Sequence, residues 1–187
     1  VEIHYKAVSD QDTVANFTNH AYFNLEGHAS GSVLGQELML RASNFTPVID
    51  SKAIPTGELA PVAGTPMDFT TAKTIGRDIE TDDIQVNYGG GYDHNFVLDK
   101  QEKGAFELIA EAYAPGTGIV MKVFTDLPGV QFYSGNFITT QDGKQGAVYE
   151  KRQGFCLETQ YFPNSVNEPN FESPILKAGE VYTTKTS

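Results

Sequence analysis

Positive charge is scarce in this sequence. The chain carries 13 Lys and Arg residues against 24 Asp and Glu residues, which gives a formal net charge of -11. Its only arginines are Arg41, Arg77 and Arg152. Nucleic acids and anionic membranes are bound by clustered Lys and Arg side chains that neutralise phosphate groups. The composition therefore argues against both as partners.

Cysteine and long apolar runs are equally scarce. The single cysteine, Cys156, cannot form an internal disulfide, and its neighbours Phe155 and Leu157 suit an inert thiol in a reducing compartment. No segment approaches the roughly 18 apolar residues of a membrane-spanning helix. The first residues, Val-Glu-Ile-His-Tyr-Lys, lack the basic-then-apolar pattern of a secretory signal. We therefore expect a cytoplasmic protein without membrane attachment.

Apolar and polar residues alternate along much of the chain, which predicts strands rather than helices. Residues 1–7 alternate in this way, and in residues 106–113 apolar side chains alternate with Glu107, Glu111 and Tyr113. Segments rich in Gly, Pro, Asn and Asp separate further short strand-like runs, at residues 37–41, 95–98, 119–125, 130–133, 155–161 and 181–185. This pattern predicts an all-β sandwich or barrel in which helices are few.

The length bounds the number of domains. A chain of 187 residues can bury one hydrophobic core and is short for two, so we expect one domain over residues 1–187. Residues 47–74 contain four prolines but keep apolar side chains such as Met67 and Phe69. We expect this segment to be a long ordered loop that packs on the sheet.

Two segments far apart in sequence each place one titratable side chain among aromatic residues. These are Asn16–Leu25, which contains His20, and Gly154–Pro163, which contains Glu158. Successive side chains of a strand point to opposite faces. In the first segment the expected core face holds Phe17, Asn19, Ala21, Phe23 and Leu25, and the polar face holds Asn16, Thr18, His20, Tyr22 and Asn24. In the second, Phe155, Leu157, Thr159 and Tyr161 oppose Cys156, Glu158, Gln160 and Phe162.

A third expected strand repeats this arrangement. Val130 and Phe132 oppose Gln131 and Tyr133. Three strands thus offer polar faces with few full charges. Each hydroxyl of a sugar both donates and accepts hydrogen bonds, and Asn, Gln, Tyr, His and an occasional carboxylate match that requirement. The sequence therefore predicts a site for a hydroxyl-rich ligand.

Several motifs, taken in order, resemble those of the aldose 1-epimerase (galactose mutarotase) family. They are Thr18-Asn-His-Ala-Tyr-Phe-Asn-Leu25, Pro55-Thr-Gly-Glu58, Gly91-Tyr-Asp-His-Asn-Phe96, Gly129-Val-Gln-Phe-Tyr-Ser-Gly-Asn136, Gly154-Phe-Cys-Leu-Glu-Thr-Gln160 and the stretch from Pro163 to Phe171. The resemblance covers nearly the whole chain, and no single motif carries it alone. It implies a mutarotase-type β-sandwich (supersandwich), no cofactor or metal, and interconversion of the α and β anomers of an aldohexose such as galactose or glucose.

The resemblance also implies roles for four residues. Glu158 matches the general base that removes the proton of the C1 hydroxyl, and His20 the general acid that protonates the ring oxygen. The ring then opens, rotates about the C1–C2 bond and closes with the two roles exchanged. Asp93 matches a carboxylate that binds the sugar, and Gln131 a sugar-binding amide; both would orient the ring.

The sequence departs from the family pattern in one respect. Family members are considerably longer, and no segment here matches the Arg and the His that their N-terminal region contributes to sugar binding. The chain also stops without the closing strand that we would expect. We hypothesise a partial sandwich that lacks N-terminal strands, is completed by a complementary segment, or associates with itself through exposed sheet edges.

Other interpretations stay open at this stage. Taken alone, His20 could be a structural histidine, Asp93 a turn cap after Gly89-Gly-Gly, and Glu158 a solvent-facing carboxylate. Aromatic neighbours would instead raise the proton affinity of Glu158 toward neutral pH. The histidines His4, His28 and His94 show no metal-ligand spacing.

Two alternative functions also stay open. A non-catalytic carbohydrate-binding module of the same fold is one, because fold alone does not fix function. A hexose-phosphate epimerase is the other, although no arginine lies in a matched motif.

Overall fold

Strand segments from the whole chain assemble into two antiparallel sheets. The structure, a computed structural model, describes residues 1–187. The larger sheet has the order β1 (Ile3–Val8), β15 (Val181–Thr186), β9 (Ile119–Thr125), β8 (Glu107–Ala114), β3 (Glu37–Leu40) and β6 (Lys73–Thr74). The smaller sheet has the order β13 (Cys156–Gln160), β10 (Gly129–Tyr133), β7 (Asp93–Val97), β4 (Asn44–Phe45) and β5 (Ala60–Pro61).

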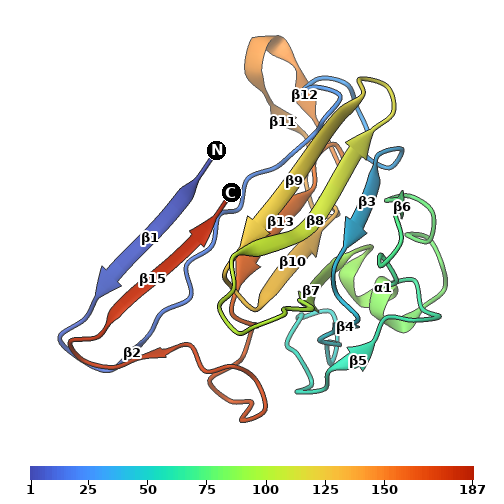
Figure 1. The fold of residues 1–187 in the computed structure, drawn as a ribbon. Coiled ribbons are helices and arrows are strands. Elements are labelled where there is room, and N and C mark those ends of the chain that lie inside the picture. The colour runs from blue at the N-terminus through green and yellow to red at the C-terminus, as the bar shows by residue number, and fades with distance from the viewer.

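Four short strands and two helical segments complete the structure. β11 (Gln141–Asp142) pairs with β12 (Val148–Tyr149), and β2 (Thr13–Val14) pairs with β14 (Ile175–Leu176). The β11–β12 hairpin projects from the body of the molecule (Figure 1) and holds the 3₁₀ turn Lys144–Gly146 at its tip. The α-helix α1 spans Ile84–Gly89. None of the helical segments has the length and the apolar character needed to cross a membrane.

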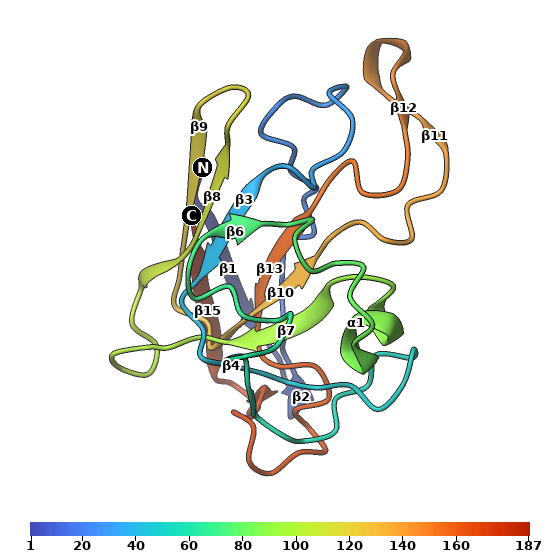
Figure 2. The same ribbon diagram turned by 90° about the vertical axis from the view of Figure 1, so that its right-hand side faces the viewer.

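The two sheets pack against each other through one hydrophobic core. The core cluster has 22 buried residues and draws on both sheets, with Leu38, Leu40, Ile109, Ala110 and Val123 from the larger sheet and Phe96, Val130, Phe132 and Leu157 from the smaller one. Figure 2 shows the strands of the larger sheet lying against the smaller sheet. Burial of this apolar surface is the main force that holds the layers together. The predicted all-β sandwich is confirmed.

Most of the expected strands are present within a residue or two of their predicted ends. The strand expected at residues 106–113 is β8, but its alternation is interrupted by a register shift between Leu108 and Ala110. Because of this bulge, Ile109 and Ala110 are both buried, and Phe106 is 42% exposed. The prediction that every second residue from Phe106 faces the core was therefore wrong. The extra residue at the bulge reverses which residues point to the core in the rest of the strand.

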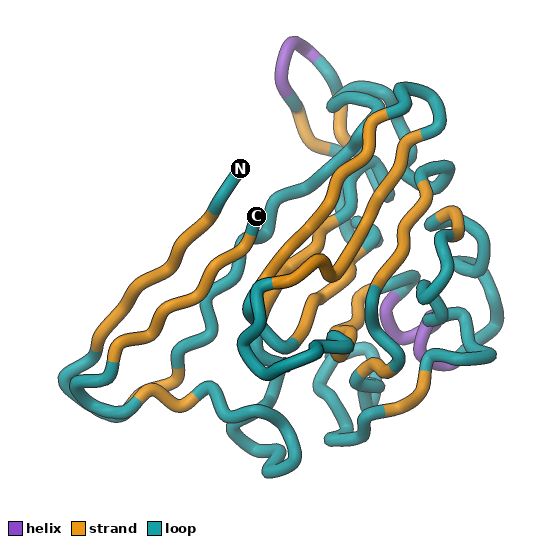
Figure 3. The backbone as a smooth tube through the Cα atoms, in the orientation of Figure 1, coloured by secondary structure: helices purple, strands orange, loops and turns teal.

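The segment from Asn16 to Leu25 is not a ladder strand as expected. Its only strand-like pairing is an isolated bridge between Phe23 and Phe155, and Figure 3 shows the chain between β2 and β3 as loop. Phe17, which we expected in the core, is 42% exposed; its ring stacks on Tyr5 and meets the Tyr182 ring edge to face. Without a partner strand, strict alternation of faces does not apply.

The segment at residues 47–74 contains the two-residue strands β5 and β6 but otherwise is an ordered loop, as predicted. Met67 and Phe69 are buried in the core, whereas Ile49 and Leu59 are exposed. The buried side chains of Met67 and Phe69 thus anchor an irregular segment to the core although the segment forms no continuous ladder.

A helix that the sequence analysis did not predict, α1, lies just before β7. The Asp83 side chain accepts hydrogen bonds from Gln85 N and Val86 N and so caps the N-terminus of α1. Gly90 ends the helix in the left-handed conformation, with φ 62°. Only six residues long, the helix was hidden by its lack of a periodic apolar face.

The larger sheet is continuous over only part of its width. β15 pairs fully with β1 but meets β9 at the single position Thr186↔Thr125, and the two strands then diverge (Figure 1). Threonine hydroxyls hold this junction: Thr186 Oγ1 lies 3.0 Å from Thr125 Oγ1 and 2.6 Å from Thr159 Oγ1. Most of the outer edge of β9 therefore has no strand partner.

Candidate active site

His20 lies on a loop that is anchored at both ends to the flanks of β13. At one end the Asn16 side chain donates to Tyr161 O (3.0 Å) and accepts from Tyr161 N (2.9 Å). At the other end Phe23 and Phe155 exchange two backbone hydrogen bonds of 2.8 and 3.0 Å. These clamps hold the intervening loop along the edge of β13. His20 therefore lies beside β13 although its segment does not pair with β13 as a strand.

The three strands β13, β10 and β7 present one polar face to this histidine. Gln131 on β10 pairs with Glu158 on β13 and with Asn95 on β7, so these side chains share a face. Tyr133 pairs in the same way with Cys156 and Asp93. The faces predicted for β10 and β13 are confirmed at these positions.

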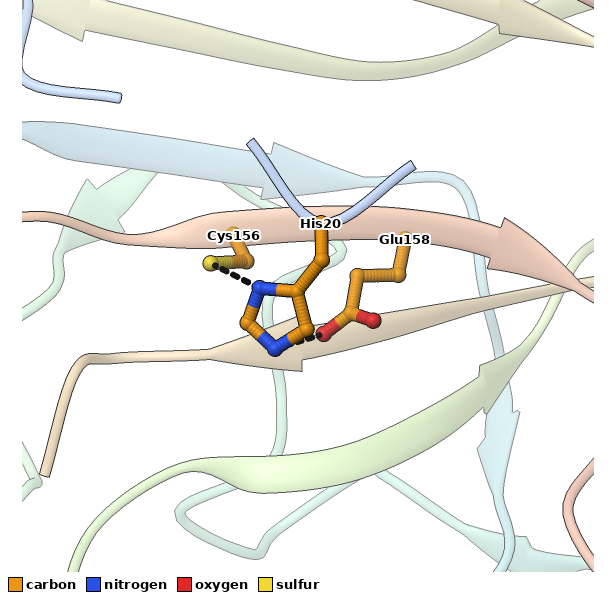
Figure 4. A group of neighbouring side chains, drawn as sticks. All are labelled: His20, Cys156 and Glu158. Carbon is orange, nitrogen blue, oxygen red and sulfur yellow. Dashed lines mark hydrogen bonds and ion pairs between the residues drawn. The ribbon is translucent and has the colours of Figure 1, made fainter. Parts of the chain in front are cut away.

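His20 and Glu158 are in direct contact. The imidazole Nε2 lies 3.4 Å from Glu158 Oε1 (Figure 4). The Glu158 side chain is only 11% exposed, whereas that of His20 is 50% exposed. Glu158 is thus nearly buried, whereas His20 is half exposed to solvent. The alternative of a solvent-facing Glu158 is therefore wrong.

The surroundings of Glu158 favour its protonated form more than water does. Burial raises the pKa of its carboxyl group, and the nearby Asp93 carboxylate raises it further, while the His20 imidazole acts in the opposite direction. Burial likewise raises the pKa of Asp93, against the effect of the Gln131 hydrogen bond. A carboxylate with a raised pKa accepts a proton more readily at neutral pH.

Asp93 and Gln131 belong to a chain of hydrogen bonds across the three strands. Gln131 Nε2 donates to Asp93 Oδ1 (2.8 Å), and Gln160 Nε2 donates to both Gln131 Oε1 and Asn95 Oδ1 (3.2 Å each). The amide of Gln131 is thereby oriented on both sides. This network, rather than a turn cap, is what Asp93 joins.

The approach to Asp93 is fixed by a tight turn. Gly91 has φ 137°, and a side chain there would collide with Asn136 Oδ1. Asn136 Nδ2 in turn donates to the carbonyl oxygens of Gly89 (3.0 Å) and Tyr92 (2.9 Å). Gly91 therefore serves close packing of the backbone against Asn136.

A cavity of about 850 Å³ opens beside these groups. His20, Asp93 and Tyr133 line it at one end, and Lys144 and Tyr149 of the hairpin line it at the other. Glu158 and Gln131 are not among its lining residues; Glu158 reaches the cavity through its contact with His20. The volume lies in the upper part of the range found for small-molecule sites.

None of the three arginines lines this cavity. Arg152 is ion-paired with Glu80 and donates to Gly90 O (3.0 Å), and Arg77 contacts Asp78. His94 also lies elsewhere, on the core face of β7 beside Phe45, where burial lowers its pKa to about 4. These side chains stabilise the fold around the site.

Several site residues were not singled out from the sequence. Cys156 Sγ lies 3.3 Å from His20 Nδ1, Gln160 joins the amide network, and the Tyr22 and Tyr133 rings flank the His20 ring. Burial raises the pKa of Tyr22 to about 12. Alternation from Glu158 and Gln131 already put Cys156, Gln160 and Tyr133 on the polar face. That signal could have found them, but nothing indicated Tyr22 beyond its proximity in sequence to His20.

His20, Cys156 and Glu158 offer donor atoms that all lie within 4.8 Å of one another. Such a group has the composition of a metal site. The imidazole, however, turns Nδ1 to the thiol and Nε2 to the carboxylate (Figure 4). An ion on either nitrogen would therefore lie beside only one of the two other donors. A hydrogen bond to the thiol and an ion-pair contact with the carboxylate account for this geometry better than a shared ion does.

The family model described as aldose 1-epimerase matches residues 1–187. The chain belongs to the aldose 1-epimerase family. It is 44% identical over 185 residues to the galactose mutarotase of Sus scrofa, which covers 98% of this chain and 52% of that protein. It is 37% identical over 188 residues to the aldose 1-epimerase of Escherichia coli K12, with 100% and 53% covered. The chain thus spans about half the length of these curated relatives of the aldose 1-epimerase family.

Solved structures show the same fold. A GalM/aldose epimerase homologue from C. elegans superposes with a TM-score of 0.86 at 24% identity, over 99% of this chain and 54% of that one. Galactose 1-epimerase from Lactobacillus acidophilus NCFM gives 0.78 at 27% identity, over 99% and 52%. The mutarotase-type β-sandwich expected from the sequence is therefore confirmed.

Proposed function

We propose that this chain carries the acid–base pair of an aldose 1-epimerase and interconverts the α and β anomers of aldohexoses such as galactose and glucose. One observation supports this above all others: His20 Nε2 and Glu158 Oε1 lie side by side, 3.4 Å apart. The two oxygens that exchange protons in anomerisation, O1 and the ring oxygen, are bonded to the same carbon. An adjacent acid and base can therefore reach both at once.

The proposed reaction moves two protons. Glu158 takes the proton from the C1 hydroxyl while His20, as imidazolium, gives the Nε2 proton to the ring oxygen. The bond between C1 and the ring oxygen breaks, and C1 becomes an aldehyde carbon. After rotation about the C1–C2 bond, His20 takes the proton of the C5 hydroxyl, Glu158 gives its proton to the aldehyde oxygen, and the ring closes on the other face. Each positioned group of this kind contributes roughly 10² to 10⁴ in rate.

Asp93 and Gln131 are proposed to hold the sugar. Their mutual hydrogen bond of 2.8 Å joins the Gln131 amide to Asp93, which lines the cavity together with His20. Hydroxyl groups of a pyranose need such paired donors and acceptors. A fixed ring brings C1 to the acid–base pair and lowers the entropic part of the barrier.

Replacement of Glu158 by Gln tests the proposal. The optical rotation of fresh α-D-galactose and α-D-glucose is followed with the chain, with Glu158→Gln and with the exposed control Glu102→Gln. We expect acceleration by the first and third samples, and a loss of roughly 10² or more with Glu158→Gln. Binding of methyl β-galactoside, which cannot mutarotate, should change little in the variant.

Two other outcomes would contradict the proposal. Lost affinity for the methyl glycoside with no mutarotation by any sample would indicate a binding module. No acceleration and no binding by a folded chain would show that the pair is insufficient alone. Addition of the unmatched half of a relative would then reveal whether a complementary segment supplies the missing groups.

Two wider expectations accompany this function. The core that unites both sheets supports one domain over residues 1–187, which a single cooperative unfolding transition would bear out. Cys156 is a free, buried thiol, in keeping with a reducing cytoplasm. Cell fractionation that finds the protein outside the cytoplasm would refute that location.

A further inference from the structure

Cys156 contacts the proposed acid on the side away from Glu158. Its sulfur lies 3.3 Å from His20 Nδ1, and this is the only hydrogen-bond contact of that nitrogen. Cys156 and Glu158 are two residues apart on β13, so both project from the same face. Figure 4 shows the imidazole between them, with one nitrogen turned to each. The ring orientation is therefore set from both sides.

Two arrangements of the proton are compatible with this contact. The thiol S–H could donate to Nδ1, which would leave the neutral ring with its proton on Nε2. Alternatively, Nδ1–H could donate to the sulfur, which would leave Nε2 free to gain or lose a proton. Hydrogen positions follow from the chemistry of the neighbours, so the two arrangements must be distinguished by what they allow.

The first arrangement conflicts with proton transfer at Nε2. A neutral ring protonated only on Nε2 would become an imidazolate if it gave that proton to the ring oxygen, and such an anion is inaccessible near neutral pH. In the second arrangement the imidazolium gives up the Nε2 proton and remains a neutral ring that carries its proton on Nδ1. The same ring can take the proton back when the sugar closes.

The state of the thiol fits the second arrangement. Cys156 is fully buried, and burial, together with the Glu158 and Asp93 carboxylates, raises the pKa of its thiol. The sulfur is therefore neutral. A neutral sulfur is a weak acceptor that orients the ring without stabilising the imidazolium as strongly as a carboxylate would. His20 can then both hold and release its proton.

We propose that Cys156 is a positioning residue whose sulfur accepts a hydrogen bond from His20 Nδ1–H, so that Nε2 alone exchanges a proton with the sugar or with Glu158. The catalytic part of this inference rests on the proposed function. The proposed proton transfer at Nε2 is also what selects this tautomer, but its measurement is independent of activity, because the tautomer is a property of the folded chain without substrate.

The tautomer is measured first, by ¹⁵N NMR of the imidazole nitrogens at a pH where His20 is neutral. We expect His20 in the wild-type chain to carry its proton on Nδ1. In Cys156→Ala the ring should shift toward the Nε2–H form, and in Cys156→Ser, where a hydroxyl oxygen can accept, the Nδ1–H form should return. A wild-type ring protonated on Nε2 would overturn the proposal, whether or not the chain is active.

Kinetics supply the second readout. With Cys156→Ala we expect kcat for mutarotation to fall about tenfold, as for the loss of one hydrogen bond, with little change in KM. Cys156→Ser should recover most of the loss. Thermal unfolding of both variants confirms that they fold. Equal activity in Cys156→Ala and the wild-type chain would refute a positioning role, and equal losses in both variants would indicate packing only. If the wild-type chain is inactive, the proposed function fails, and the NMR result still decides the tautomer.

Discussion

The two faces of the strands β13, β10 and β7 are both largely buried, yet they differ in almost every other property. The face turned to the larger sheet carries Phe96, Phe132 and Leu157, which are at most 6% exposed. The opposite face carries Glu158 and Asn95, which are 8% and 2% exposed. Burial alone therefore does not separate core from site in this molecule. The hydrogen-bonded polar side chains of the second face do.

The difference has an energetic consequence. The apolar face contributes roughly 25 cal/mol per Å² of area removed from water. The polar face gains no comparable term, because its carboxyl groups are desolvated, which raises the pKa of both Glu158 and Asp93. We infer that the apolar face stabilises the fold and that the polar face holds reactive groups at some cost in stability.

The largest effect is expected from a substitution in the active site that leaves the core unchanged. His20→Gln removes the proposed acid but keeps a polar side chain at a half-exposed position. We expect mutarotation to slow by roughly 10² to 10⁴, with the melting temperature nearly unchanged. Polarimetry and thermal unfolding measure the two quantities, with the exposed His4→Gln as the matched control. A strong loss of stability together with activity would place His20 in the scaffold instead.

A substitution on the apolar face should mainly lower the stability of the fold. Phe132 is fully buried and packs on Phe69, Tyr92 and Phe155. Phe132→Ala should lower the free energy of unfolding by about 3–5 kcal/mol, since it leaves a cavity in the core. Phe137, 64% exposed, serves as control, and its truncation should cost much less. Urea titration measures both. Similar losses for the two variants would contradict the division between faces.

A smaller effect is expected from the centre of the amide network. Gln131→Leu leaves Asp93 Oδ1 and Gln160 without their shared partner. We expect a rise in KM for galactose that corresponds to about 1–3 kcal/mol, as for an unsatisfied buried polar group. Initial-rate kinetics across sugar concentrations measure it, beside the control Gln101→Leu, which is exposed and lies outside the cavity lining. An unchanged KM would exclude Gln131 from sugar binding.

The smallest effect concerns the pH dependence of stability. Burial raises the pKa of Glu158 above its ordinary value of 4.5, so the folded state binds this proton more tightly than the unfolded state. Stability from this group is complete below pH 4.5 and is lost as the pH rises through the folded pKa. Glu158→Gln lacks this loss. The variant should therefore gain stability relative to the wild-type chain as the pH rises from 4 to 8, measured by urea titration. A constant difference would show that the carboxyl group is not desolvated.

The sequence predicted the apolar face more fully than the polar one. Period-two alternation located β10 and β13 and put Phe132 and Leu157 on the core side, because a strand has only two faces. The contact of His20 with Glu158 could not come from alternation, since the His20 segment forms no ladder. It depends on clamps such as Asn16 on Tyr161, which join residues 145 positions apart. The bulge in β8 and the six-residue helix α1 were not predicted for a related reason. Both depend on local hydrogen bonds rather than on a periodic pattern of apolar residues.

The central claim is that His20 and Glu158 act as one acid–base unit, and a double-mutant cycle measured by polarimetry tests it most directly. The wild-type chain, His20→Gln, Glu158→Gln and the double variant are compared on α-D-galactose. We predict that each single variant loses most of the acceleration and that the double variant loses little more than the worse single one, because neither group works without the other. Losses that multiply would show that the two residues act independently and would contradict the account.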